Sequence, residues 1–144
     1  HSSTTILKLK TMLTKYELDQ SNVIILPPQP YEKIPDYINA SDVIIAPYKK
    51  VVKNYGTPLK ILEALACGKP VITTNIKEFK LWFHDIPVTY YIDEADLKEK
   101  VLQVLKTLDT TEKTLLEIAE KIRRKFSWNT IASQYEKLIQ ELCY

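Results

Sequence analysis

The chain has 144 residues, of which 45% are hydrophobic and 26% charged, as is ordinary for one globular domain with its own core. Its 20 basic and 18 acidic residues are well mixed and leave a net charge of +2, so nothing favours a nucleic-acid partner. No apolar run approaches the roughly 20 residues that a membrane span requires. The two cysteines, Cys67 and Cys143, do not suggest a disulfide framework, and we therefore expect a reduced, cytoplasmic protein.

The first third of the chain predicts two helices and two strands. After residues 1–3, which we interpret as the remnant of an expression tag, the apolar spacing of residues 4–18 predicts a helix. Residues 23–26 and 43–46 are short, wholly apolar runs that predict strands of a parallel sheet covered on both faces. Prolines end both runs, and residues 31–40 between them predict a short helix.

The segment 55–74 predicts a loop, a short helix, a tight turn and a buried strand. Thr57 is a suitable N-cap, and Pro58 suits the first helical position because its missing N–H group is not needed there. Gly68 is placed to adopt the left-handed conformation just after the helix, and Pro70 prevents the helix from continuing. These local signals predict where the helix ends and the strand begins.

Two features of this helix indicate a ligand. Glu63 is the single polar residue of an otherwise apolar stretch, so its carboxylate is either paired with Lys60 one turn earlier or kept for a ligand. The first-turn N–H groups, from Leu59 to Ile61, lack partners within the helix, and Gly56 leaves room for a ligand to approach closely. A helix start of this kind suits an anion.

The rest of the chain continues the alternation of helices and strands. Residues 75–83 predict a short helix, residues 88–92 a strand, and residues 94–108 and 111–125 two helices with regular apolar spacing. Ser127 is a suitable N-cap for a last amphipathic helix. The chain therefore predicts an α/β fold, a Rossmann-like parallel sheet flanked by helices, with further helices at the C-terminus. Four strands would leave an open sheet edge, which dimerisation would cover.

Residues 55–74 resemble the donor-site segment of GT-B-fold glycosyltransferases, in particular the retaining family 4. The family pattern is Glu-Gly-x-Gly-x-Pro-x-x-Glu-Ala-x-Ala-x-Gly-x-Pro-Val, and the variant Tyr-Gly-Ser/Thr-Pro-Leu-Lys-x-x-Glu is closer still. Residues 23–26, 40–47 and 126–128 also fall where the family has comparable features. The resemblance implies that residues 1–144 are a single domain, the C-terminal, donor-binding part of a GT-B enzyme. It also implies that the first two βα units of this domain and the N-terminal acceptor domain are missing from the chain.

The resemblance gives two positions a role toward the ribose and the sugar. Glu63 matches the second glutamate of the family motif, which accepts hydrogen bonds from the ribose hydroxyls of the nucleotide. Tyr55 stands where the family has its first glutamate. The Tyr55 hydroxyl or Asn54 would have to replace that contact with the donor sugar, and the alternative is that Tyr55 only packs in the loop.

The resemblance also implies contacts to the phosphates and the base. The backbone of Gly56, Thr57 and Leu59 would hold the donor phosphate and sugar, although a glycine before a helix is also a common loop residue. Lys60 would add a positive charge at the phosphates or pair with the motif glutamate. Pro28 lies in the loop after the first predicted strand, where it would border the nucleotide base through its backbone or serve as a rigid turn.

The implied activity is transfer of a sugar from a nucleotide-diphosphate sugar to an acceptor hydroxyl of a glycan, a lipid or a small molecule. The helix dipole and basic residues, rather than a metal ion, would stabilise the leaving diphosphate, and no cofactor is expected. The chain identifies no catalytic residue, and the longer protein would work in the cytoplasm or at the cytoplasmic face of the membrane. The alternatives are a GT-B-class nucleotide-sugar epimerase or a non-catalytic subunit, which the departure at Tyr55 favours, and a flavodoxin-like binding module.

Overall fold

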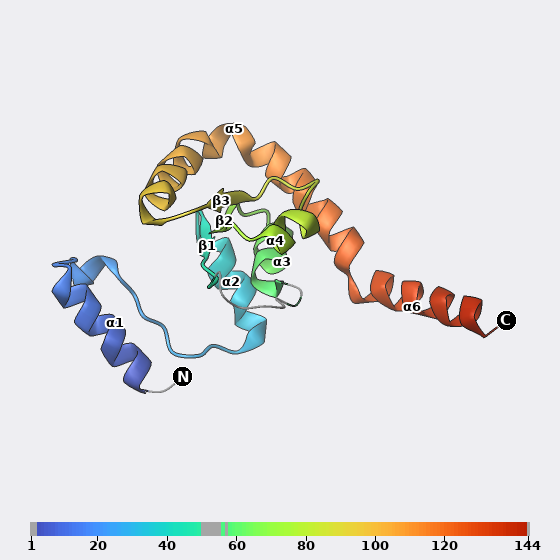
Figure 1. Ribbon diagram of the computed structural model, residues 1–144, viewed down its shortest axis with the longest axis horizontal. Coiled ribbons are helices and arrows are strands. Elements are labelled where there is room, and N and C mark those ends of the chain that lie inside the picture. The colour runs from blue at the N-terminus through green and yellow to red at the C-terminus, as the bar shows by residue number, and fades with distance from the viewer. Residues whose placement is uncertain (1–2, 50–55, 57, 144) are drawn as a thin grey trace. The chain divides into compact units, whose positions relative to one another are not determined.

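The computed structural model describes residues 3–49, 56 and 58–143 (Figure 1). The chain divides into two compact units, His1–Ile34 and Pro35–Tyr144, and each is described by itself. The second unit contains the whole parallel sheet and the helix that the sequence singles out as a ligand site.

The first unit is helical where it is regular. α1 spans Ser3–Lys15, and the short 3-10 helices η1 and η2 span Gln20–Asn22 and Tyr31–Lys33. α1 confirms the predicted helix, which stops shortly before Glu17 adopts a positive φ of 51°.

The strand expected at residues 23–26 is not formed, and this prediction is wrong. The backbone there is irregular, and the Ile24 side chain is 82% exposed. A strand is held by ladder hydrogen bonds to a neighbour, whereas no strand pairing among the described residues involves this segment. An apolar run is therefore not sufficient for a strand when no neighbouring strand pairs with it.

The second unit is built on a parallel three-stranded sheet. β1 (Ile44–Ala46), β2 (Val71–Thr74) and β3 (Thr89–Tyr91) lie in the order β1-β2-β3. Ile45 of β1 lies opposite Ile72 of β2, and both strand pairs are parallel. The other three predicted strands and the α/β class are thereby confirmed. The central strand β2 is buried at all four residues, as expected for a strand with helices on both faces of its sheet.

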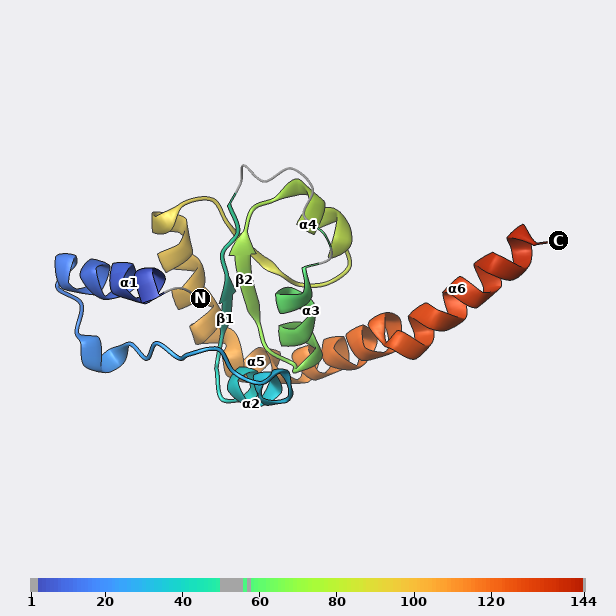
Figure 2. The same cartoon turned by 90° about the horizontal axis from the view of Figure 1, so that it is seen from below.

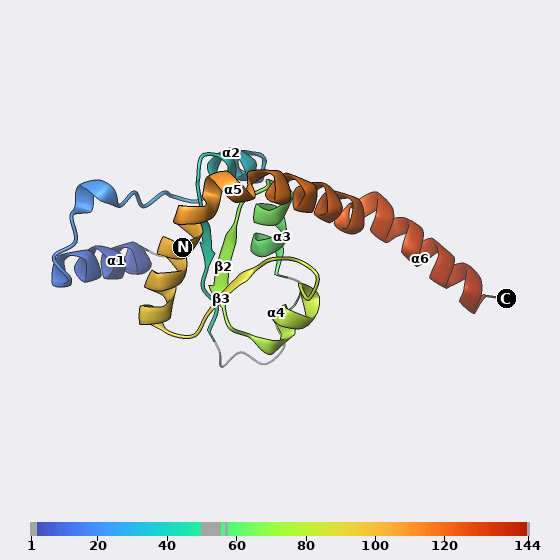
Figure 3. The same ribbon diagram turned by 90° about the horizontal axis from the view of Figure 1, so that it is seen from above.

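Helices flank this sheet on both sides. α2 (Ile34–Asn39) begins at the boundary between the units, and it is followed by α3 (Leu59–Ala66), α4 (Lys77–Trp82), α5 (Glu94–Phe126) and α6 (Trp128–Leu142). Figure 2 and Figure 3 show the first turns of α5 on one side of the strands and α3 and α4 on the other. The middle of α5 crosses near the amino ends of β1 and β2, so the carboxyl ends of these strands lie at the opposite end of the sheet (Figure 2).

α5 is a single helix of 33 residues, where the sequence predicted two helices at 94–108 and 111–125. No Gly or Pro separates the two predicted segments. The hydroxyls of Thr110 and Thr111 both donate to the Thr107 carbonyl at 2.9 Å, one turn earlier. Such bonds bend a helix slightly and do not end it, and α5 is curved in Figure 1.

The core forms where α3, α4 and α5 pack around the sheet. The largest fully buried side chains are those of Phe79, Phe83, Ile61, Leu65, Ile72, Ile122, Val71 and Thr73. α5 also bonds the end of α3, because Arg123 Nε donates to the Ala66 carbonyl at 2.8 Å. This bond satisfies one of the last carbonyl groups of α3, which have no partner within the helix.

The tight turn after α3 is formed as predicted. Gly68 has a φ of 70°; its N–H group donates to the Leu65 carbonyl, and the Lys69 N–H group donates to the Ala64 carbonyl, both at 3.0 Å. A Cβ atom at Gly68 would have room, since its nearest contact would be Leu116 Cδ2 at 3.7 Å. The need for glycine therefore comes from the backbone conformation and not from crowding.

We predict that Gly68→Ala lowers the free energy of unfolding by about 1–2 kcal/mol, which is the usual cost of placing an L-residue in the left-handed region. Gly56→Ala is the matched control, because nothing lies within 4 Å of its Cβ position and its φ is outside that region. The control should leave stability unchanged or raise it by up to about 1 kcal/mol, since alanine restricts the unfolded chain. Urea denaturation measures both, and equal stabilities of the two variants would contradict this role of Gly68.

Candidate functional site

The carboxyl ends of parallel strands form the edge at which open α/β sheets bind ligands. Here β1 ends at Ala46, β2 at Thr74 and β3 at Tyr91. From β1 the chain passes through Pro47 and Tyr48 and leads in sequence to the start of α3. Along the chain, the segment that the sequence predicts to bind a donor thus follows the strand end at this edge of the sheet.

Two buried threonines close β2 at this edge. Thr73 and Thr74 are 0% and 3% exposed. The Thr73 hydroxyl donates to the Ala46 carbonyl at 2.7 Å. The Thr74 hydroxyl accepts from the Tyr48 N–H group at 2.9 Å and lies 3.0 Å from the Tyr48 carbonyl oxygen and 3.2 Å from the Tyr91 hydroxyl. These hydrogen bonds hold the point at which the chain leaves β1.

The start of α3 differs by one residue from the prediction. Pro58 is buried and takes the N-cap position, so the helix begins at Leu59. The N–H groups of Ile61 and Leu62 both donate to the Pro58 carbonyl, at 3.0 and 3.2 Å. The expectation that the Ile61 N–H group lacks a partner is therefore wrong, because this group donates to the carbonyl of the N-cap residue. The N-cap predicted at Thr57 lies outside the described residues.

Glu63 stands out on α3 because it is half-buried between the buried residues Leu62 and Ala64. Lys60, one turn earlier, is exposed. Glu63 has an interaction partner. The ion pairs formed within the described residues do not include a pair between Glu63 and Lys60. A partly exposed carboxylate on a helix of the core can accept hydrogen bonds from two neighbouring hydroxyls of a ligand.

The other predicted site residues fall into three groups. Gly56 is exposed, nothing lies within 4 Å of its Cβ position, and it stands two residues before Pro58, the N-cap of α3. Asn54 and Tyr55 lie outside the described residues. Pro28 is exposed and belongs to the first unit, where the neighbouring Gln29 side chain donates to a backbone carbonyl. Of the predicted set, the structure thus describes Gly56 and the first turns of α3 in the second unit and Pro28 in the first unit.

The buried hydroxyls at the sheet edge were not predicted from the sequence. Thr73 and Thr74 follow Val71 and Ile72 in a strand that is wholly buried. A buried hydroxyl requires a hydrogen-bond partner, so two adjacent threonines at the end of such a strand are a signal for cross-strand bonds. The sequence does not identify the partners of these hydroxyls, because Thr73 and Thr74 bond residues that lie 27 and 26 positions away.

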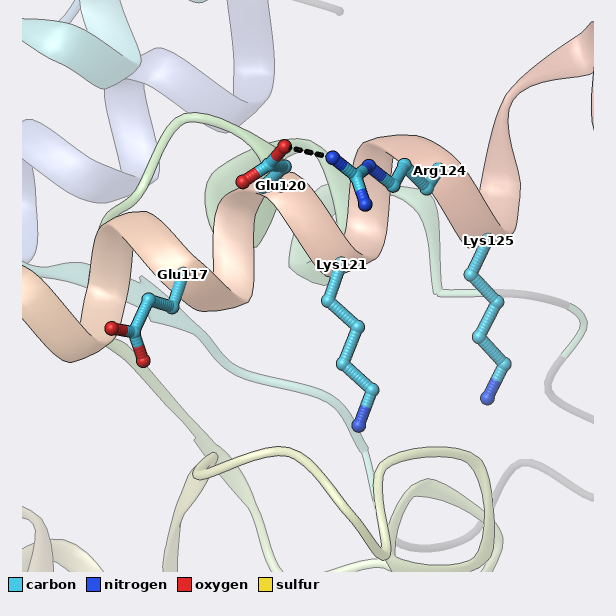
Figure 4. Close-up of a pocket in the computed structure, with 5 residues that line it drawn as sticks. All are labelled: Glu117, Glu120, Lys121, Arg124 and Lys125. Carbon is cyan, nitrogen blue, oxygen red and sulfur yellow. Dashed lines mark hydrogen bonds and ion pairs between the residues drawn. The ribbon is translucent and has the colours of Figure 1, made fainter.

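A hollow on the surface of α5 is lined by charged side chains. Figure 4 shows the residues that line it, which are Glu117, Glu120, Lys121, Arg124 and Lys125. Glu120 pairs with Arg124, and Lys121 Nζ lies 2.6 Å from Asp85 Oδ2. No residue predicted to bind a donor lines this hollow, and we interpret it as a solvated, charge-paired face of the helix.

Metal-binding clusters and membrane-spanning helices are both absent from the part of the chain that the structure describes. Within it, no group of three or more His, Cys, Asp or Glu side chains is arranged to hold a metal ion. None of the helices in the same ranges combines the length and the apolar character that crossing a membrane demands.

Proteins similar to this chain are glycosyltransferases. The model of the family described as Glycosyl transferases group 1 matches residues 6–107. A Bacillus subtilis glycosyltransferase named for teichuronic acid biosynthesis is 33% identical over 122 residues, which cover 81% of this chain and 30% of that protein. An uncharacterized glycosyltransferase of Methanocaldococcus jannaschii is 24% identical over 138 residues, which cover 94% of this chain and 37% of that protein. The chain thus spans about a third of the length of these curated relatives. No solved structure matches it.

The ion pair beside α5 makes a prediction about pH. Lys121 holds the pKa of Asp85 below its ordinary value, chiefly through its hydrogen bond to the carboxylate. Lys121→Met removes both the charge and the donor, so the pKa of Asp85 should rise toward the value of about 3.9 found in unstructured peptides. Lys125→Met is the matched control, because Lys125 acts on Asp85 only through a weaker electrostatic attraction.

An NMR titration of the Asp85 carboxyl carbon in the wild type and both variants measures these pKa values. Because the folded-state pKa is lowered, the pair stabilises the fold at neutral pH. That contribution is lost as the pH falls below about 4, through the lowered pKa. If Asp85 titrates identically in the wild type and in Lys121→Met, the pair does not exist in solution.

Proposed function

Because the chain belongs to the glycosyl transferases group 1 family, we propose that it is the donor-binding part of an enzyme that transfers a sugar from a nucleotide-diphosphate sugar to an acceptor hydroxyl. The proposal includes retention of configuration at the transferred sugar, as in the family 4 enzymes that the sequence resembles. The match over residues 6–107 includes all three strands of the sheet and α3. The names of the relatives support the transferase class.

The observation that carries this proposal is the fold of the segment from Pro58 to Val71. Pro58 caps α3, Gly68 forms the left-handed turn, and Val71 begins the buried central strand. Within this segment Glu63 stays partly exposed while its neighbours Leu62 and Ala64 are buried. An ionised carboxylate at such a position supports a role in binding the two ribose hydroxyls of the nucleotide, because it can accept from both at once.

The donor diphosphate is proposed to bind at the start of α3. Gly56 leaves open space there, and the positive end of the helix dipole favours an anion. The backbone of Thr57 and Leu59 would complete this contact, and the exposed Lys60 would add a positive charge. Fixed dipoles and charges of this kind stabilise the charge that develops on a leaving diphosphate.

The remaining contacts concern the sugar, the base and the acceptor. Tyr55 or Asn54 would replace the contact of the first motif glutamate with the donor sugar, and Pro28 would border the base. The catalytic groups and the acceptor site are proposed to lie in the rest of a longer protein. The relatives support this division, because the chain corresponds to about a third of their length.

We predict that Glu63→Gln in the intact protein weakens the binding of a nucleoside diphosphate about tenfold. A hydrogen bond to a charged acceptor contributes about 1.5–3 kcal/mol, against roughly 1 kcal/mol for a neutral one. Calorimetric titration with uridine, guanosine, cytidine and adenosine diphosphates measures the affinity. Glu120→Gln is the matched control, because it removes an exposed carboxylate that pairs with Arg124 on α5.

The control should bind nucleotide as the wild type does, and the thermal stability of both variants should change little. Equal affinities of the wild type and Glu63→Gln would show that Glu63 has only a structural role. A wild type that binds none of the four nucleotides would contradict the proposed function itself.

We predict further that residues 1–144 alone form no product from any nucleotide sugar, whereas the intact protein does. The reason is that the sequence identifies no catalytic residue in this chain, and the catalytic groups and the acceptor site are proposed to lie in the rest of the longer protein. The measurement is product formation with a range of glycan and lipid acceptors. The donors are the uridine, guanosine, cytidine and adenosine diphosphate sugars. Turnover by the purified 144-residue chain would show that it holds a complete active site.

A further inference from the structure

The last turn of α3 is held by hydrogen bonds from two sources. From the tight turn that follows the helix, the Cys67 N–H group donates to the Glu63 carbonyl at 3.1 Å. From α5, Arg123 Nε donates at 2.8 Å to the carbonyl of Ala66, the final residue of α3. Arg123 thus completes the C-terminal end of α3, where a helix leaves its last carbonyl groups without partners of its own.

The backbone of α5 beside Arg123 is fixed in the core. Ile118 and Ile122 of α5 are buried and belong to the same apolar cluster as Ile61 and Leu65 of α3. The Arg123 side chain itself is exposed and reaches from α5 to the end of α3. The bond to the Ala66 carbonyl therefore joins the end of α3 to a helix that cannot shift without disturbing closely packed side chains.

Glu63 lies one turn before the carbonyl that Arg123 bonds. Burial raises the pKa of the nearby Cys67 thiol, the positive charge of Arg123 acts to lower it, and the carboxylate of Glu63 acts to raise it. Both charges are therefore within electrostatic reach of one sulfur atom at the end of α3. Because the Glu63 carbonyl is also bonded by the residue that follows Ala66, a loosened helix end would disturb the turn that carries the Glu63 side chain.

We propose that Arg123 is a positioning residue for Glu63, an inference that rests on the function proposed above. The contact concerned is the one between the Glu63 carboxylate and the two ribose hydroxyls of a nucleotide. A carboxylate that accepts from two hydroxyls at once must point in one direction, and hydrogen bonds to the element that carries it keep that direction fixed. Arg123 touches no part of the nucleotide in this proposal and acts through the last turn of α3.

Two replacements of Arg123 separate its hydrogen bond from its charge. Glutamine places an amide nitrogen as many bonds from the backbone as the Nε atom of arginine, so Arg123→Gln keeps a donor there and removes the charge. Arg123→Met has a side chain of the same length to this point and removes both. Arg124 supplies the matched control, because it pairs with Glu120 on the same helix. Arg124→Met removes an equal charge and leaves the Arg123 bond in place.

The experiment measures the binding of nucleotides to the intact protein and its variants by calorimetry. Uridine, guanosine, cytidine and adenosine diphosphates are compared with their dideoxy forms, which lack both ribose hydroxyls. For the nucleotide that the wild type binds, we expect Arg123→Met to raise the Kd about fivefold, because the Glu63 carboxylate is then less firmly directed. Arg123→Gln and Arg124→Met should leave the Kd within about twofold of the wild type, since both keep a donor to the Ala66 carbonyl.

The dideoxy nucleotides distinguish positioning of Glu63 from a general loss of structure. They offer no hydroxyls to its carboxylate, so the wild type and Arg123→Met should bind them equally, within about twofold. A rise of the Kd as large for the dideoxy form as for the parent nucleotide would overturn the positioning role, because looser packing of the whole unit would then explain the effect. Equal binding of both forms by the wild type would overturn it too, since no hydroxyl contact would remain to be positioned.

Two further outcomes would overturn the role of Arg123 and leave the proposed function standing. One is an unchanged Kd in Arg123→Met, with tight binding by the wild type. The other is an equal rise of the Kd in Arg123→Gln and Arg123→Met, which would assign the effect to the charge and not to the hydrogen bond. If the wild type binds none of the four nucleoside diphosphates, the proposed function fails and this inference fails with it.

Discussion

The hydrogen bonding of β2 is the constraint on which the second unit depends. As the central strand it pairs with β1 on one side and β3 on the other, and all four of its residues are buried. Val71 and Ile72 meet this requirement with apolar side chains, whereas Thr73 and Thr74 carry hydroxyls that cannot reach water. A buried hydroxyl without a partner destabilises a fold by about 1–3 kcal/mol, so these two groups must bond elsewhere in the chain. They bond the end of β1 and the residue that follows its proline.

This arrangement connects the stability of the sheet to the geometry of the candidate site. The same strand that closes the core also holds the chain at the carboxyl edge, where α/β proteins bind their ligands. Gly68 couples the site to β2 from the other direction, since its left-handed turn ends α3 and directs the chain into the strand. α5 crosses at the amino ends of the strands, and Arg123 bonds the last turn of α3 there. The carboxyl edge lies at the end of the sheet opposite to this crossing.

Sequence alone was sufficient for most features that depend on a few neighbouring residues. Apolar runs bounded by proline or glycine located the strands at 44–46, 71–74 and 89–91, and the spacing of Pro58, Gly68 and Pro70 located α3 and its turn to within a residue. The motif around Glu63 identified the family, because it combines a helix start, a carboxylate and a turn at fixed separations. These signals act through backbone conformation and local hydrogen bonds, which do not require a partner from a distant part of the chain.

Most of the features that the sequence did not reveal depend on distant partners. Residues 23–26 are as apolar as the true strands, but a strand also requires a neighbour to bond, and pairing alone decides this. The two helices expected after β3, which proved to be one, are an exception, because the threonines between them bond a carbonyl only three or four residues earlier. The partners of Thr73 and Thr74 lie more than 25 residues away and follow from the parallel register of β1 and β2. Sequence therefore determined the local elements and the family, whereas tertiary structure decided which buried polar groups meet, because only the folded chain brings distant hydrogen-bonding groups within reach of one another.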